Sequence, residues 1–420
     1  MMTVVKNRQV TVVGAGFTGL TAAYYLSRAG FKVKIVETNK GVGGLISTIP
    51  AAGGLVETAA NGLLSNAEVE SLFYEIGVPL QATKPEARRR YIYRDGRFHR
   101  WPLGIAASFR VLTFLARYLF KRSSLKPTES ETISEWGARH LGEEATKYLL
   151  ATALQGIYAG DPDQLGARNV LGRFFEKSKS QPGKIRGTIA PLNGMGELMR
   201  GLRSYLERRG VEFEFEKQFS FDGRPGNPVV LAVSKAEAFG LLAKTKNGKE
   251  RQDELGQAEM LPLVTATLFF NFTHRETQGF GCLFPPVEKR RVLGVLKNDF
   301  IFSNRNSGKY NRKLHSETWI AGGAFAKDIT KLSKPDLLKM IVEERKEVFG
   351  LNEEPETFEI TVWPEALPHY TTEMKIAPEL REMKENVMLA GNYLGPIGLS
   401  QILLRAKEIP GEVERNGQWI

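Results

Sequence analysis

The chain has 420 residues, of which 42% are hydrophobic and 25% charged, and 58 Lys and Arg against 47 Asp and Glu give a formal net charge of +11. Single hydrophobic cores stop growing near about 250–300 residues, so the length favours two or more domains. The basic balance suits nucleic acid, an anionic membrane surface or an acidic small molecule. The sequence has no zinc spacing, aromatic RNA-binding box or helix-turn-helix pattern, so no nucleic-acid partner is expected.

Cysteine content and hydropathy indicate a cytoplasmic protein. Cys282 is the one cysteine, which excludes an intrachain disulfide and fits a reducing compartment, and we expect it to be a small buried residue. Residues 1–17 lack the apolar run of a signal peptide, and no window reaches the roughly 18 uncharged apolar residues of a spanning helix. The sequence has five histidines, His99, His140, His274, His315 and His369. Their spacing is not that of a metal site, so no metal is predicted.

The stretch "QVTVVGAGFTGLTAAYYLSRAGFKVKIVE" predicts a strand, a glycine turn, a helix that ends at Gly30, and a second strand that leads to Glu37. The turn reads Gly14-x-Gly16-x-x-Gly19. In that spacing the first glycine permits a tight turn, the second lets backbone approach a pyrophosphate, and the third lets the helix pack closely on its strand. The helix N-terminus offers free N–H groups, and Glu37 can accept the hydroxyls of an adenosine ribose. We therefore predict a dinucleotide site.

Two further segments identify the dinucleotide. The glycine pair Gly43-Gly44 in "ETNKGVGGLIST" resembles the second half of the fingerprint of FAD-dependent amine oxidases and their relatives, where it runs beside the flavin's diphosphate and ribityl chain. The C-terminal "NVMLAGNYLGPIGLSQILLRAKEI" predicts a strand at 387–390, a loop and a helix. The N-terminus of that helix could face the flavin's pyrimidine carbonyl, whereas the alternative is a glycine cap that serves packing alone. FAD is the predicted cofactor.

The inserted segments resemble the protoporphyrinogen oxidases. The matching stretches, in matching order, are "RRRYIYRDGRFHRWPLG", "LQGIYAGDPDQL", "GFGCLFPPVEKRRVLGVL", "ETWIAGGAF" and "VWPEALPHY". The resemblance implies an FAD-dependent oxidase that dehydrogenates a porphyrinogen (protoporphyrinogen IX to protoporphyrin IX) with dioxygen in haem biosynthesis. Coproporphyrinogen III is a close rival substrate.

The resemblance also implies the site residues. Arg90 would hold a substrate propionate, although a solvated basic patch at 88–90 is the alternative. Gly156, in a glycine-rich turn closed by Asp161-Pro162, would face the macrocycle, and Leu283 and Leu296 would sandwich it. The residues expected to bind FAD are Gly14, Ala15, Gly16, Phe17, Thr18, Gly19, Glu37, Lys40, Gly43, Gly44, Leu45, Asn61, Gly62, Trp363, Gly391, Asn392, Gly395, Ile397 and Gly398. The flavin carries the chemistry, so no catalytic side chain is assigned.

The expected fold class is α/β. A Rossmann-like FAD-binding domain is interrupted by an α+β substrate-binding domain and a helical insert. The predicted ranges are 1–81, 186–252 and 373–420 for the FAD domain, 82–85, 164–185 and 253–372 for the substrate domain, and 86–163 for the insert.

The insert contains a basic amphipathic segment at 101–122. Arg110, Arg117 and Lys121 fall on one helical face, and apolar residues fill much of the rest. One hypothesis is peripheral contact with the inner face of the cell membrane, and the alternative is a core helix. The protein is expected to be a monomer or a homodimer.

The sequence also departs from the family pattern. Gly41 stands where a cofactor-contacting arginine is usual, and we expect the neighbouring Lys40 to replace it as a point charge. Ala59, Pro396 and Ala406 stand where glycines are usual. Two other hypotheses stay open. One is an amine or polyprenoid oxidoreductase of the same fold, and the other, motivated by the lost glycines, is a flavin-binding scaffold with decayed activity.

Overall fold

The structure is a computed structural model that describes residues 8–51, 53–176, 181–221, 226–245, 248–256, 258–271, 277–306, 314–374, 380, 382–395 and 397–419. Pro396 and His274, both noted in the sequence, lie outside the described residues.

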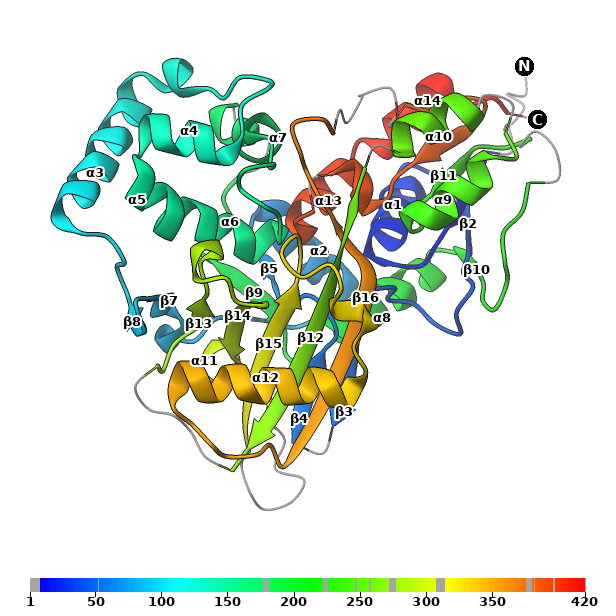
Figure 1. The fold of residues 1–420 in the computed structure, drawn as a ribbon. Coiled ribbons are helices and arrows are strands. Elements are labelled where there is room, and N and C mark those ends of the chain that lie inside the picture. Colours follow the sequence, from blue (N-terminus) through cyan, green and yellow to red (C-terminus); the bar gives the residue numbers. More distant parts are fainter. Residues whose placement is uncertain are drawn as a thin grey trace, which may run out of the picture.

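A five-stranded parallel sheet forms around the N-terminal glycine turn (Figure 1). Its order is β10 (Glu212–Glu214), β2 (Lys32–Val36), β1 (Gln9–Val13), β11 (Val229–Leu231) and β17 (Val387–Leu389). Strands from three distant parts of the sequence thus share one sheet, as the interrupted-domain prediction required.

Helices cover both faces of this sheet, as the apolar strands of a parallel sheet need. On one face, α1 (Phe17–Arg28), α8 (Met195–Arg208), α13 (Leu399–Ala406) and α14 (Ile409–Asn416) pack over Val10 and Val12. On the other face, α9 (Lys235–Leu242) and α10 (Gly248–Gly256) pack over Val13, Val229 and Leu231. The predicted strand, helix and second strand between Gln9 and Glu37 are therefore confirmed, as are the predicted C-terminal strand and the helix after it.

A seven-stranded mixed sheet forms the second layer. Its order is β16 (Thr357–Pro368), β12 (Met260–Phe270), β15 (His315–Gly322), β14 (Val292–Lys297), β13 (Gly281–Leu283), β7 (Arg90–Arg94) and β8 (Arg97–His99). The helix α12 (Lys334–Phe349) runs across one face of this sheet (Figure 1) and packs on Val264 and Trp319. Because side chains alternate along a strand, Leu263 and Thr265 point to the other face.

Smaller elements connect these layers. Two short sheets pair β3 (Thr48–Ala51) with β4 (Gly54–Glu57), and β9 (Thr188–Pro191) with β5 (Leu63–Leu64) and β6 (Leu80–Ala82). Short helices outside the helical block described below are α2 (Ala67–Ile76), η1 (Pro85–Arg88), η5 (Pro286–Glu288), α11 (Asn298–Ile301), η6 (Ile329–Lys331) and η8 (Asn392–Leu394).

A helical block lies at the upper left of Figure 1, away from the parallel sheet. It comprises α3 (Ile105–Phe120), η2 (Arg122–Leu125), α4 (Ile133–His140), α5 (Glu143–Ala145), a π-helical turn (Thr146–Leu150), α6 (Ala151–Tyr158), α7 (Ala167–Leu171) and η4 (Gly172–Phe175). The predicted insert boundary at residue 86 needs a correction, because β7 and β8 are strands that join the seven-stranded sheet through β13. The other domain boundaries stay predictions.

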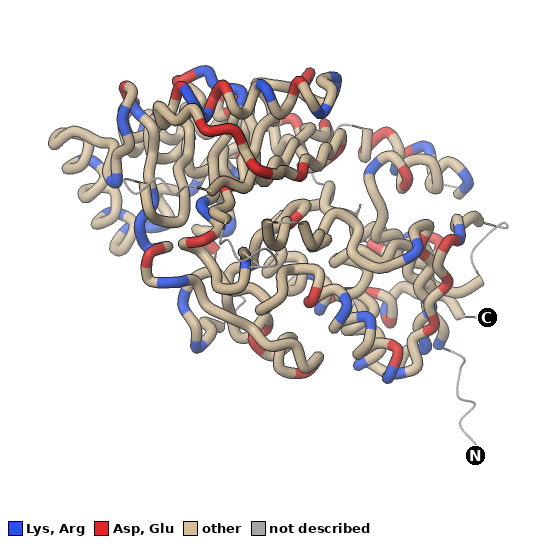
Figure 2. Tube along the Cα trace, turned by 90° about the horizontal axis from the view of Figure 1, so that it is seen from below, with Lys and Arg blue, Asp and Glu red and all other residues tan. Residues whose placement is uncertain are grey.

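The helix α3 turns its apolar face outward. Ile105 is 92% exposed, Phe109 68%, Leu112 62% and Leu119 77%, and its buried residues are Ala107 and Val111. The alternative of a core helix is therefore wrong for this face. No helix among the described residues combines the length and apolar character that crossing a membrane requires. Figure 2 shows Lys and Arg interspersed with Asp and Glu along most of the chain, so the net positive charge is not confined to one segment.

Candidate active site

A cavity of about 780 Å³ lies between the two large sheets. This volume falls in the upper part of the range of about 300–1,000 Å³ that is usual for ligand pockets. It lies at the carboxyl ends of β1, β2 and β11, where ligands bind in parallel sheets. Of the residues predicted to bind FAD, those that line it are Gly14, Gly16, Phe17, Thr18, Glu37, Gly43, Gly44, Leu45, Asn61, Gly62, Trp363, Gly391, Asn392, Ile397 and Gly398.

The glycine turn has the geometry that its spacing predicted. Gly14 has φ +99°, and a Cβ there would lie 2.5 Å from the Ala232 carbonyl oxygen. A Cβ on Gly19 would lie 1.9 Å from the Gly14 carbonyl oxygen, so this glycine serves helix packing and does not line the cavity. A Cβ on Gly16 would meet no atom nearer than 3.9 Å. The turn therefore leaves open space at Gly16, where a pyrophosphate would approach.

The second glycine pair packs directly against the first turn. The Gly43 N–H donates to the Ala15 carbonyl (2.9 Å), and a Cβ on Gly44 would lie 3.2 Å from the Gly16 Cα. Both glycines have positive φ, at +137° and +60°. The two glycine segments thus contact each other at one wall of the cavity.

The Glu37 carboxylate is buried and fixed in orientation. Its Oε2 accepts the Ala15 N–H (2.7 Å), and its Oε1 accepts the backbone N–H and the side-chain amide of Asn39 at 2.9 and 2.7 Å. Glu37 is 7% exposed and lines the cavity. A carboxylate held in this way has lone pairs left for the hydroxyls of a ribose.

Two helices point uncapped N-termini at the cavity. α1 begins after Gly16 and α13 after Gly398, and neither has a side-chain cap. Their first N–H groups and positive dipole ends suit anionic or electron-rich groups of a ligand. Arg405 on α13 fixes the preceding loop, because its guanidinium donates to the carbonyls of Ala390 (3.0 Å), Gly391 (3.2 Å) and Gly395.

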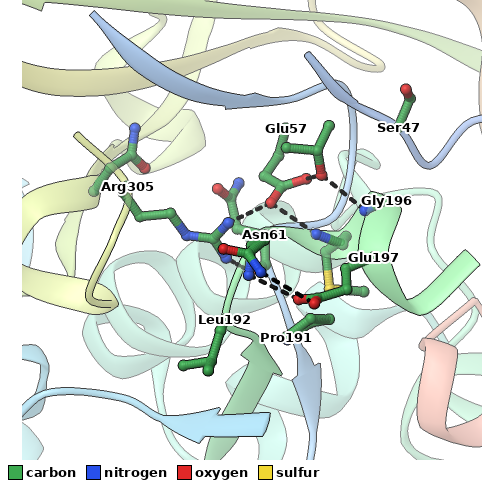
Figure 3. Close-up of polar contacts among 12 residues, drawn as sticks. Ser47, Glu57, Asn61, Pro191, Leu192, Gly196, Glu197 and Arg305 are labelled. Atoms are coloured by element: carbon green, nitrogen blue, oxygen red, sulfur yellow. Dashed lines mark hydrogen bonds and ion pairs between the residues drawn. The ribbon is translucent and has the colours of Figure 1, made fainter. Parts of the chain in front are cut away.

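A buried ion pair joins Glu57, at the end of β4, to Arg305, which lies between α11 and β15. Figure 3 shows the Glu57 carboxylate between the Arg305 guanidinium and the N-terminus of α8. Arg305 Nη1 lies 2.5 Å from Glu57 Oε1, Arg305 Nη2 donates to the Asn61 carbonyl (3.2 Å), and the Met195 N–H donates to Glu57 (2.9 Å). Burial raises the pKa of Glu57, against the opposing charge of Arg305, and burial also lowers the pKa of Arg305. The pair therefore positions the segment Asn61–Leu63, which lines the cavity.

The remaining wall is largely apolar. It is formed by Leu263, Phe280, Leu293, Leu296, Phe302, Ile320 and Leu367, together with the helix α6 at Gln155, Gly156 and Ile157. Thr265 and Trp363 also line it, and both donate to the Thr58 carbonyl, at 3.0 and 2.8 Å. A flat apolar ligand fits this wall better than a charged one.

Gly156 requires a correction to its predicted conformation. It lies inside α6 and not in a turn, and the turn begins only after Ala159, whose φ is +53°. A Cβ on Gly156 would lie 2.8 Å from Leu283 Cδ2, so Leu283 packs on the glycine and does not itself line the cavity.

The turn that follows α6 is closed as predicted. The Asp161 side chain accepts the Asp163 N–H (2.9 Å), and its carbonyl accepts the Gln164 and Leu165 N–H groups. Tyr158 is a buried packing residue in edge contact with Tyr370, with ring centroids 5.6 Å apart.

Six of the predicted site residues do not line the cavity: Ala15, Gly19, Lys40, Arg90, Leu283 and Gly395. The Lys40 side chain is 88% exposed and its ammonium is 3.9 Å from Glu216. Arg90 is exposed, but its guanidinium lies over the ring of Phe280, 4.6 Å from the centroid, and Phe280 lines the cavity. A Cβ on Gly395 would lie 2.9 Å from Tyr370, so this glycine shapes the loop.

Sequence reasoning missed one part of the wall. Lys217, Phe219, Ser234, Lys235 and Glu237 follow β10 and β11 and line the cavity beside Glu37. Burial and then the charge of Glu37 raise the pKa of Glu237. Their position after two predicted strands could have indicated them, because the carboxyl ends of parallel strands meet at one edge of a sheet.

The described residues thus fit a flavin dinucleotide: two uncapped helix N-termini, open backbone at Gly16 and an oriented carboxylate surround one cavity. The family model for flavin containing amine oxidoreductases matches residues 17–221 and 222–396. The chain belongs to this family. It is an FAD-dependent oxidoreductase, and the predicted Rossmann-like α/β fold is confirmed.

Among relatives, this flavin oxidoreductase is 25% identical to protoporphyrinogen oxidase 2, chloroplastic/mitochondrial, of Arabidopsis thaliana, over 94% of this chain and 92% of that one. It is 22% identical to coproporphyrinogen III oxidase of Bacillus subtilis, over 93% and 92% of the two chains. Among solved structures, cyclohexylamine oxidase of Brevibacterium oxydans superposes with a TM-score of 0.70 at 15% identity, covering 97% of this chain and 100% of that chain. That likeness supports the fold alone.

Proposed function

We propose that this flavin oxidoreductase dehydrogenates a porphyrinogen, with dioxygen as the final electron acceptor, in haem or porphyrin biosynthesis. Protoporphyrinogen IX is the preferred substrate. The observation that carries the proposal is one cavity whose polar end is built for a dinucleotide and whose other wall is apolar and broad. Two relatives named for porphyrinogen oxidation align over nearly the whole chain.

The chain's own residues would hold and orient the reactants. The Gly14–Gly19 turn, Glu37, the Gly43-Gly44 pair and the N-terminus of α13 would hold FAD. When bound, FAD supplies the hydride acceptor. Phe280, Leu293 and Leu296 would hold a tetrapyrrole by apolar contact and exclude water. No His, Cys or Tyr occurs among the described residues that line the cavity, and its titratable side chains are Glu37, Lys217, Lys235, Glu237 and Glu365. We assign the side chains of the wall to binding and orientation.

Arg90 would bind a propionate of the substrate at the edge of the cavity. Its guanidinium is exposed and stacked on Phe280, which leaves its N–H groups free to meet a carboxylate. Coproporphyrinogen III is the second candidate, because Arg88 and Arg89 are also exposed beside Arg90 and that substrate has more carboxylates.

Steady-state oxidation of both porphyrinogens tests these assignments. Arg90→Ala should raise KM about 10-fold or more, as expected for a lost charge-assisted contact, and leave the flavin content unchanged. Arg97→Ala is the matched control, because Arg97 is an exposed arginine on the neighbouring strand β8. Equal KM values for the two variants would contradict the role of Arg90, and loss of flavin from Arg90→Ala would reassign it to the cofactor.

We also propose that α3 makes peripheral contact with an anionic membrane surface. Its outward residues Ile105, Phe109 and Leu112 are apolar, and Arg110 and Arg117 on the same helix are exposed. The protein should co-sediment with anionic vesicles, and Phe109→Glu with Leu112→Glu should abolish this binding. Wild-type protein that stays in the supernatant would contradict the proposal.

A further inference from the structure

Gln155 is buried in the wall of the cavity with its side-chain oxygen unpaired. It lies on α6, directly before Gly156, and is 2% exposed. Its Oε1 has no hydrogen-bond partner. Among the described residues that line the cavity, Gln155 alone has a buried side-chain oxygen or nitrogen atom without a hydrogen-bond partner. A buried polar atom without a partner costs the protein stability, so its retention in a site points to a ligand.

Three other uncharged polar side chains that line the cavity already make hydrogen bonds. Thr265 and Trp363 both donate to the Thr58 carbonyl, and Asn392 donates to the Ala366 carbonyl (3.1 Å). The backbone carbonyl of Gln155 accepts the Ala159 N–H at 2.9 Å, whereas its side-chain Oε1 accepts no hydrogen bond. The next residue on the wall is Gly156, which has no side chain, and the apolar side chain of Leu296 lines the same cavity.

We infer that Gln155 is a positioning residue for the ring nitrogens of a tetrapyrrole. This inference rests on the proposed function. The core of a porphyrinogen is an apolar macrocycle whose polar groups are four pyrrole N–H donors. An apolar wall offers these donors no hydrogen-bond acceptor, and the Gln155 side-chain oxygen would supply one. Rotation about the last side-chain torsion exchanges the amide oxygen and nitrogen. The same side chain can therefore accept from a pyrrole N–H of the substrate and donate to an imine nitrogen of the oxidised porphyrin.

Two substitutions on the same helix test this role. Gln155→Met keeps the length of the side chain and removes both hydrogen-bonding groups. Leu154→Met is the matched control, because Leu154 is buried one position earlier, does not line the cavity and undergoes a volume-conserving change. The measurements are KM and kcat for protoporphyrinogen IX, flavin content, and the melting temperature of each protein without substrate.

The inference predicts opposite changes in stability and in substrate binding. Gln155→Met should raise KM by about 5- to 10-fold, the usual effect of one lost hydrogen bond, with kcat and flavin content near the wild-type values. Its melting temperature without substrate should rise, because the unpaired oxygen is gone. A glutamine with a merely structural role would lower the melting temperature when replaced. Leu154→Met should change none of these quantities appreciably.

Three results would overturn the inference. An unchanged KM in Gln155→Met would show that the amide does not meet the substrate. Loss of flavin from that variant would assign the amide to the cofactor. Wild-type protein that oxidises neither porphyrinogen would refute the proposed function itself, and the assignment of Gln155 would fall with it.

Discussion

Replacing Glu57 by glutamine should destabilise the protein strongly, because it leaves the Arg305 guanidinium buried without a counter-charge. The two side chains are 2% and 3% exposed. Glutamine has nearly the shape of glutamate and can still accept the Met195 N–H, so the change leaves no cavity. It removes the charge and the acceptor of the Thr48 hydroxyl (2.7 Å). The loss should therefore report the ion pair and not a cavity.

The magnitude follows from the burial of the pair. Removing one partner of a buried ion pair costs about 3–5 kcal/mol of unfolding free energy. Burial raises the pKa of Glu57 and lowers the pKa of Arg305, which means that desolvation opposes both charges. The double variant Glu57→Leu with Arg305→Met removes both charges, so it should recover most of the loss.

Urea denaturation of the single and double variants measures these free energies. Glu207→Gln is the matched control, because its ion pair with Arg203 spans 2.8 Å on the surface of α8, with side chains 44% and 38% exposed. This control should cost no more than about 1 kcal/mol. An equally small effect for Glu57→Gln, or a double variant less stable than both single variants, would refute the reasoning.

Two further predictions concern the dinucleotide end of the cavity. Gly16→Val should abolish flavin retention with little change in apoprotein stability, because a Cβ at Gly16 has open space, whereas Gly14→Val should unfold the turn, since a Cβ at Gly14 would strike the Ala232 carbonyl. Flavin content and the apoprotein melting temperature check both variants. A Gly16→Val protein that purifies with full flavin would contradict the placement of the flavin beside Gly16. Glu237→Gln should raise the apoprotein melting temperature at pH 7. The pKa of Glu237 is higher in the folded chain than in the unfolded chain, so ionisation of Glu237 destabilises the fold as pH rises above the unfolded-chain pKa. The difference in melting temperature between variant and wild type should therefore vanish below about pH 4, where both side chains are neutral. A pH-independent difference would mean that titration of Glu237 is not its cause.

Local sequence patterns predicted the dinucleotide end of the site well. The positive φ of Gly14, the close packing of Gly19 and the position of Glu37 after β2 each depend on residues that are near in sequence. Such constraints are written in one strand–turn–helix unit, so spacing alone reveals them.

Long-range packing decided the features that sequence reasoning missed. Glu57 and Arg305 are 248 positions apart, and neither has a local pattern that indicates the other. The strand β7 joins β13 in parallel, a pairing that bridges nearly 200 residues, so the range 86–163 was predicted as helical throughout. The apolar face of α3 has the same helical spacing whether it packs in a core or faces outward, and only the folded chain distinguishes the two.

Anaerobic mixing with protoporphyrinogen IX is the most direct test of the central claim. The wild-type protein should purify yellow, and its visible flavin absorption should bleach when the substrate is mixed in without air. Admission of air should restore the absorption while porphyrin fluorescence appears. The same experiment with coproporphyrinogen III ranks the two substrates. Yellow protein whose flavin stays oxidised with both porphyrinogens would contradict the claim that this cavity oxidises a tetrapyrrole.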